Sequence, residues 1–87
     1  MERLTNFHVL KVIALGATNH LPARVKIVSE RFNESVIINY SNDPADAAPA
    51  IGTAQRWLTA KGFTLIGMAE GKDHYYIMST TFEPLKK

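Results

Sequence analysis

The chain has 87 residues, 46% of them hydrophobic, and a formal net charge of only +2. This length accommodates one small domain, and the hydrophobic content is typical of a folded protein rather than a disordered one. The absence of cysteine excludes disulfides and thiolate metal sites, and it leads us to expect a reducing, cytoplasmic compartment.

Three strand-like runs occupy the first half of the chain: His8–Leu15, Ala23–Phe32 and Ser35–Tyr40. The first run is rich in β-branched residues and stops at Gly16. In the second run, Arg24 and Lys26 alternate with apolar residues, so both cations are expected on one face. The Asn33-Glu34 pair supplies a turn, and the second and third runs therefore predict an antiparallel hairpin.

A single helix is predicted at Ala47–Lys61, after a linker that contains two prolines. Pro49 is tolerated only in the first helical turn, which makes Asp46 the expected N-cap. A start at Asp43 is the alternative, and it would break or kink the helix at Pro49. Gly62 fits the left-handed position just after the helix. The apolar stripe of this helix comprises Ala47, Ile51, Ala54 and Leu58, with Trp57 beside it.

The last third of the chain predicts a second hairpin from two runs, Phe63–Ala69 and Tyr75–Phe82. Gly67 lies in the middle of the first of these runs, which indicates a bulge or a close backbone approach. Residues 1–6 and 83–87 are expected to be loose termini.

Residues 1–87 are thus expected to form one α+β domain with the element order β-β-β-α-β-β. A mainly antiparallel sheet would carry the single helix on one face. Several of the runs are apolar on both faces. The second face must therefore be buried elsewhere in the chain, left exposed, or used to bind something.

No motif for catalysis, metal binding or cofactor binding stands out. His8, His20 and His74 lie in separate segments and have no cluster of cysteines or carboxylates beside them. No serine lies in a G-x-S-x-G pattern, and the glycines match neither phosphate-binding nor dinucleotide-binding loops. We therefore expect a protein that is not an enzyme and that uses no metal and no cofactor.

Aromatic and basic residues of the strands are the remaining functional candidates. Rings between cations can hold single-stranded nucleic acid, whereas a tyrosine and an arginine can anchor a protein interface. Charges on a solvated sheet edge are the alternative explanation. Tyr75 and Tyr76 are consecutive, so they point to opposite faces and at most one packs under the helix. The candidate binding residues are Arg24, Lys26, Arg31, Tyr75 and Tyr76.

The expected partner is another protein or a second copy of this chain in a homodimer, with nucleic acid as the alternative. A net charge of +2 is too small to establish nucleic-acid binding, although basic residues concentrate in residues 1–31. A membrane is not expected as a partner, because no apolar stretch approaches the roughly 18 residues that cross one.

Val12–Asn19 followed by Ala23–Lys26 resembles short proteins of phages and bacterial mobile elements. Those proteins commonly show a strand, a Gly-x-Thr-Asn loop and an Arg-Val-Lys strand. Their C-terminal hairpin is similar to four segments of this chain: Gly62-Phe63, Ile66-Gly67, Ala69–Asp73 and Tyr75–Ile77. This chain departs from them at His20-Leu21-Pro22, where they tend to be basic and to contain glycine, and the departure weakens a phosphate-loop role for Gly16–Pro22. The resemblance transfers no activity, but it implies a setting in which small accessory proteins often bind nucleic acid or inhibit host defence complexes.

Overall fold

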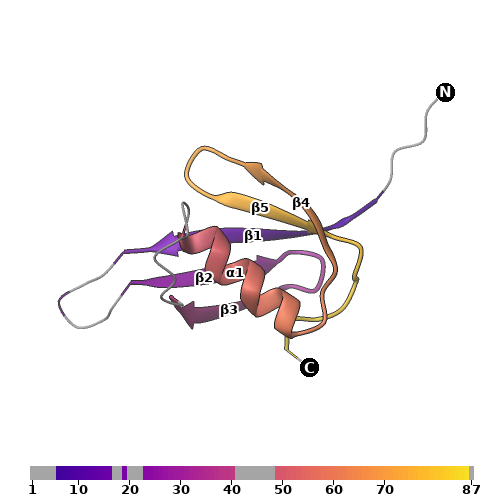
Figure 1. The fold of residues 1–87 in the computed structure, drawn as a ribbon, viewed down its shortest axis with the longest axis horizontal. Helices are drawn as coiled ribbons and strands as arrows, with labels where there is room; N and C mark the ends of the chain where they lie inside the picture. Colours follow the sequence, from indigo (N-terminus) through magenta and orange to yellow (C-terminus); the bar gives the residue numbers. More distant parts are fainter. Residues whose placement is uncertain (1–5, 17–18, 20–22, 41–48, 87) are drawn as a thin grey trace.

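The computed structural model describes residues 6–16, 19, 23–40 and 49–86. These residues form strands β1 (His8–Leu15), β2 (Arg24–Ser29) and β3 (Glu34–Asn39), helix α1 (Pro49–Ala60), and strands β4 (Leu65–Glu70) and β5 (Tyr75–Ser79). The strands make one antiparallel sheet in the order β3-β2-β1-β5-β4, and α1 lies across one of its faces (Figure 1). The predicted fold class and element order are therefore confirmed.

The β2–β3 hairpin forms at the predicted turn. Ser29 pairs with Glu34, and the N–H of Asn33 donates to the carbonyl oxygen of Glu30 at 3.2 Å. Asn33 has φ 52°, a left-handed conformation that asparagine tolerates better than most residues. The turn occupies residues 30–33, so β2 ends earlier than the predicted run did.

The core lies between α1 and one face of the sheet. From the predicted helical stripe, Ile51, Ala54 and Leu58 are buried, whereas Ala47 lies outside the described residues. The sheet supplies side chains that alternate along each strand, as the period of two requires. The buried hydrophobic residues are Leu10, Val12, Val25, Ile27, Ala50, Ile51, Ala54, Leu58, Phe63, Ile77 and Leu85.

The ends of α1 follow local backbone chemistry. The helix begins at Pro49, where a missing N–H costs little, while the candidate N-caps Asp46 and Asp43 lie outside the described residues. Gly62 has φ +98°, which a side chain would oppose. The N–H of Phe63 donates to the Leu58 carbonyl at 3.0 Å, and this bond closes the helix as a Schellman motif does.

The β4–β5 hairpin contains the irregularity that Gly67 predicted. Leu65 pairs with Ser79 and Gly67 pairs with Met78, so Ile66 is an extra residue in β4. A Cβ at Gly67 would lie 3.4 Å from the Met78 methyl carbon, an ordinary contact distance, so the end of the Met78 side chain lies beside Gly67.

The C-terminal segment corrects the expectation of a loose tail at residues 83–87. Leu85 is only 3% exposed and belongs to the core, and its N–H donates to the Glu34 carboxylate at 2.7 Å. The segment leaves the sheet after Ser79, whose hydroxyl donates to the Thr64 carbonyl and accepts from the N–H of Thr81. A hydrophobic anchor and a carboxylate from β3 together fix this segment. Lys87 and residues 1–5 lie outside the described part.

Candidate interaction surface

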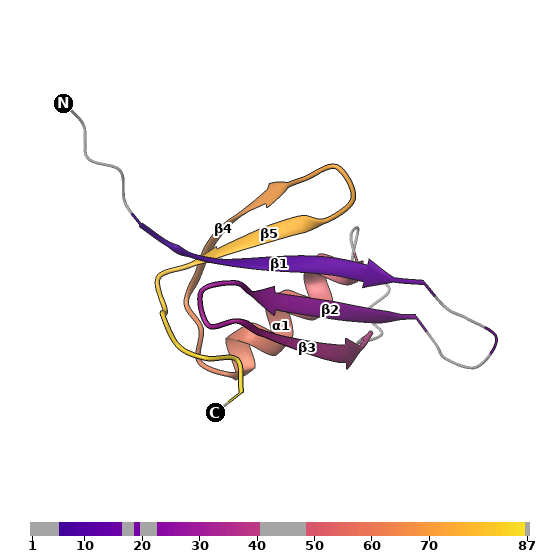
Figure 2. The ribbon, with the colours of Figure 1, turned by 180° about the vertical axis from the view of Figure 1, so that it is seen from behind.

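The sheet face opposite α1 is open, and we call its strand residues the open face (Figure 2). The strand registers place alternate side chains there. Lys11 stands between Val28 and Tyr76, and Lys26 stands between Ile13 and Ile37. The open face comprises Val9, Lys11, Ile13, Leu15, Arg24, Lys26, Val28, Ser35, Ile37, Asn39, Gly67, Ala69, Tyr76 and Met78.

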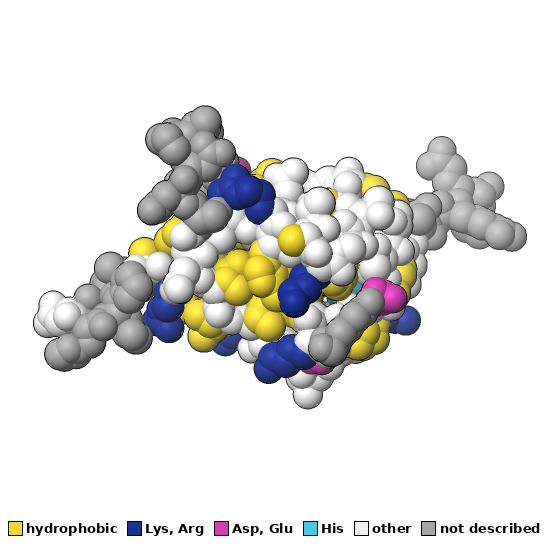
Figure 3. Space-filling view, turned by 60° about the horizontal axis from the view of Figure 1, so that its bottom comes forward, with side chains coloured by type: hydrophobic (Ala, Val, Ile, Leu, Met, Phe, Trp, Pro, Cys, Tyr) yellow, Lys and Arg dark blue, Asp and Glu magenta, His cyan; other side chains and the backbone are white. Residues whose placement is uncertain are grey.

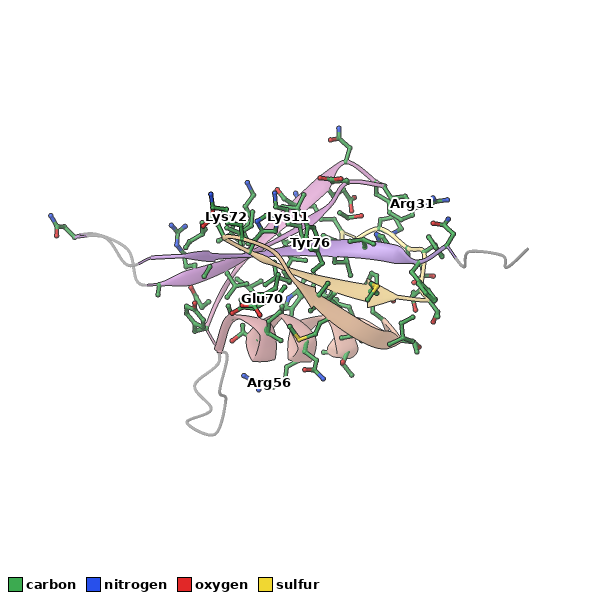
Figure 4. The ribbon with its side chains drawn as sticks, turned by 90° about the horizontal axis from the view of Figure 1, so that it is seen from above. Lys11, Arg31, Arg56, Glu70, Lys72 and Tyr76 are labelled. Carbon is green, nitrogen blue, oxygen red and sulfur yellow. The ribbon has the colours of Figure 1, made fainter. Side chains whose placement is uncertain are left out.

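None of these described strand residues is buried, so no described part of the chain covers the open face. Val9 is 44% exposed and Ile37 is 52% exposed, which are high values for large apolar side chains in a sheet. Figure 4 shows Lys11 and Tyr76 on the side of the sheet away from α1, with Lys72 of the β4–β5 turn on the same side. The open face is therefore a solvent-exposed mixture of apolar and cationic side chains.

The strand part of the open face carries only positive charge. Its cations are Lys11, Arg24 and Lys26, and none of its described strand residues is Asp or Glu. Diagonal neighbours in a sheet are roughly 7–8 Å apart, about one Debye length at physiological salt, so these cations act together. The strand carboxylates Glu34 and Glu70 fall on the face that α1 covers.

Two details add to this electrostatic picture. Glu30 lies beyond β2 in the turn, where it lines a shallow hollow with Lys26 and Ser35. The Nε of Arg24 is buried and has no hydrogen-bond partner in the part of the chain that the structure describes. A partner cannot reach this buried donor, which is a local cost to folding.

Tyr76 is held in place by the β4–β5 turn. Its hydroxyl lies 2.7 Å from His74 Nε2, and the two rings meet edge to face at 4.9 Å. His74 in turn packs closely against Gly71, whose N–H donates to the His74 carbonyl at 2.8 Å. A ring fixed in this way loses little conformational entropy when a partner covers it.

The five sequence-predicted residues separate into three places. Arg24, Lys26 and Tyr76 share the open face, as the alternation of β2 and β5 predicted. Tyr75 packs against the core on the α1 side. Arg31 lies in the β2–β3 turn with its guanidinium carbon 4.7 Å from the Phe82 ring centroid.

Several residues of the open face were missed in the sequence. Lys11 was hidden inside an apolar run, and the exposure of Ile37 was not foreseen. Alternation alone could have placed Lys11 opposite the buried Leu10 and Val12. The residues that flank Lys11 on the neighbouring strands could be identified only from the pairing register.

A second constellation joins His8, Ser29 and Thr81 inside the molecule. The Thr81 carbonyl, 2.9 Å from His8 Nδ1, can only accept, so Nδ1 donates to it, and Nε2 lies 2.7 Å from the Ser29 hydroxyl oxygen. Serine and histidine are arranged as in a nucleophile–base pair, but both side chains are fully buried. This constellation holds β1 to β2 and to the C-terminal segment, and a substrate could not reach it.

Three rings enclose the same histidine. The ring centroids of Phe32, Phe63 and Phe82 lie 5.4, 6.0 and 5.7 Å from that of His8. Among the described residues, no group of three or more His, Cys, Asp or Glu side chains could hold a metal ion. No helix in the described ranges is long and apolar enough to cross a membrane.

Comparison with known proteins adds no relative to this description. No protein family, curated protein or solved structure matches the chain.

Proposed function

We propose that this chain is a non-enzymatic binding module that docks through its open face on a protein partner with an acidic surface. The observation that carries this proposal is the composition of the exposed face, where three cations stand among apolar side chains and no strand carboxylate offsets them. Apolar contacts would supply binding energy, and charge complementarity would supply orientation and speed of association.

The charge of the open face argues against its use for self-association. Face-to-face pairing of two copies would bring two sets of Lys11, Arg24 and Lys26 together. Like charges within a Debye length repel, and burial would increase the cost. An acidic partner removes this cost.

The rings of the face favour protein over nucleic acid. Modules that hold single strands stack successive bases on several aromatic rings. Among the described strand residues, only Tyr76 offers a ring on the open face, because Tyr75 lies on the covered side. The half-exposed Val9 and Ile37 suit an apolar protein contact instead.

The biological setting of the proposal comes from the sequence. The similarity of Val12–Asn19 and Ala23–Lys26 to proteins of phages and mobile elements supports an accessory role, such as inhibition of a host defence complex. The absence of cysteine supports a cytoplasmic partner.

Site-specific crosslinking in cells tests the proposal. A photoreactive amino acid at position 37 of the open face is expected to capture an acidic protein, whereas the same group at Thr59, on the exposed side of α1, is not. With the captured protein purified, Lys26→Glu and Ile37→Glu should each weaken binding at least about tenfold, and Thr59→Glu should leave binding unchanged. Equal capture from both positions would contradict the proposal.

A nucleic-acid titration decides between the two kinds of partner. We expect single-stranded and duplex oligonucleotides of mixed sequence to bind no tighter than about 100 µM at physiological salt, the weak end of nonspecific binding. Micromolar binding with a steep salt dependence that is lost in Lys11→Ala/Lys26→Ala would contradict the proposal of a protein partner and would indicate that the partner is nucleic acid.

A further inference from the structure

The free edge of β4 is a second surface, separate from the open face. β4 ends the sheet order, so only its β5 side has a strand partner among the described residues. Its residues from Ile66 to Glu70 are all exposed, and Ile66 and Met68 are 47% and 48% exposed. A strand edge presents a row of backbone donors and acceptors, and another extended strand satisfies such a row.

A groove runs along the covered side of β4. Ile51 and Gln55 of α1 line it opposite Leu65 and Met68, and its volume is about 170 Å³. Cavities of about 150 Å³ with apolar walls accept a benzene ring, so this groove has room for one large apolar side chain. A strand added beside β4 would present alternate side chains to the groove.

The two edges of the sheet differ in how well they are protected. In β3, Val36 and Ile38 pack on the core, and Glu34 is tied to the C-terminal segment. Lysine and arginine side chains surround the hydrophobic ones on the side of the molecule that includes the β3 border (Figure 3). In β4, by contrast, five of six residues are exposed, and only the bulge near Leu65 and the charge of Glu70 protect the edge.

We propose that β4 pairs antiparallel with β4 of a second copy, so that the two sheets become continuous. The edge is complementary to itself, because Met68 both borders the groove and is half exposed beside it. The only charge of β4 is Glu70. An antiparallel pair centred on Met68 places Glu70 beside Ile66 of the copy and keeps the two Glu70 side chains at opposite ends of the contact, whereas a pair centred on Ala69 would make them diagonal neighbours. Self-pairing centred on Met68 therefore avoids like-charge repulsion, in contrast to the open face.

The proposed contact is small, so we expect a weak dimer. The bulge confines regular pairing to Gly67–Glu70, and the interface falls below the roughly 800 Å² per partner of a standard complex. Sedimentation of the wild-type chain should show a reversible dimer in a concentration series that reaches about 1 mM. A strictly monomeric chain over this series would overturn the proposal.

Single cysteines locate the contact, since the chain has none of its own. On a two-fold axis, opposite Cα atoms of antiparallel strands are about 4.5–5.5 Å apart, which a disulfide can bridge. Met68→Cys or Ala69→Cys should therefore form a symmetric disulfide dimer under mild oxidation, several-fold faster than the similarly exposed control Ile37→Cys. If Ile37→Cys crosslinks as fast as both β4 variants, the contact is not at β4.

A charge variant supplies an independent measurement. Ile66→Glu/Met68→Glu should weaken the dimer at least about tenfold, because each new carboxylate appears twice in the symmetric edge and adds to the charge of Glu70. Ile37→Glu is the control and should leave dimerisation unchanged. Circular dichroism reports whether each variant is folded, and the cysteine measurement stands if the double glutamate variant is not. Unaltered dimerisation of the folded double variant would contradict the proposal.

Discussion

The two faces of this sheet are built from the same strands but have different composition. On the covered face, Leu10, Val12 and Ile27 are fully buried beneath α1. On the open face, their chain neighbours include Lys11 and Lys26, and no residue is buried. The difference teaches that stability and binding can be assigned to alternate residues of one strand, and therefore tested separately.

The largest difference should appear when an apolar side chain is shortened on each face. Leu58→Ala removes a fully buried side chain from the covered side and should lower the free energy of unfolding by about 2–5 kcal/mol. Ile37→Ala on the open face should cost less than about 1 kcal/mol, because Ile37 is already half exposed. Urea denaturation of both variants gives the comparison, and equal losses would show that the open face is part of a buried core.

The tie between β3 and the C-terminal segment gives the next effect. Glu34→Ala removes the acceptor of the Leu85 N–H and should cost about 1–3 kcal/mol, because Leu85 loses a partly buried, charge-assisted hydrogen bond. Hydrogen exchange of the Leu85 amide should accelerate more than exchange in β1. Glu30→Ala, at an exposed position of the β2–β3 turn, is the control for removing one negative charge. An unchanged Leu85 amide would mean that Leu85 packing alone holds the segment.

The end of α1 should contribute a smaller amount. Gly62→Ala forces a side chain into a left-handed conformation and should lower stability by about 1 kcal/mol. Gly16→Ala is the matched control, since a Cβ there would have no atom within 4 Å and Gly16 lacks a positive φ. Thermal unfolding of the pair measures the difference, and no loss for Gly62→Ala would show that the last turn relaxes.

The smallest effect should come from the cations of the open face. Lys26→Ala should change the free energy of unfolding by at most about 0.5 kcal/mol, because the side chain is only partly buried and pairs with no strand carboxylate on that face. A slight gain is expected at low salt, where like charges repel most. A loss above about 1 kcal/mol would assign Lys26 to folding rather than to binding.

The order of strands and helix could be predicted from the sequence because each element is marked by a pattern within a short run of residues. Alternation marked the strands, Pro49 and Gly62 bracketed the helix, and Gly67 marked the bulge. The sequence also separated Tyr75 from Tyr76, although which of them α1 would cover depended on the register with β1.

Contacts between residues that are far apart in the sequence could not be predicted. β1 lies at the centre of the sheet because it pairs with β5 as well as with β2. Nothing local in either strand specifies that pairing. Arg31 similarly reaches Phe82, and Leu85 reaches Glu34, through approaches of chain segments that no single run of residues encodes. Arg31, which was predicted to bind a partner, and the C-terminal segment, which was predicted to be loose, therefore both make contacts within the folded domain.

The central position of β1 has a consequence for biosynthesis. Its two neighbours are made at different times, because β2 follows it closely whereas β5 begins at Tyr75. Before β5 is made, the nascent chain can form the β1–β2–β3 meander and α1, and one edge of β1 stays unsatisfied until Tyr75–Ser79 has emerged. Leu85 must leave the exit tunnel later still before the core is closed. Completion of this domain must therefore await synthesis of β5 and Leu85, and until then the unpaired edge of β1 is open to pairing with other chains.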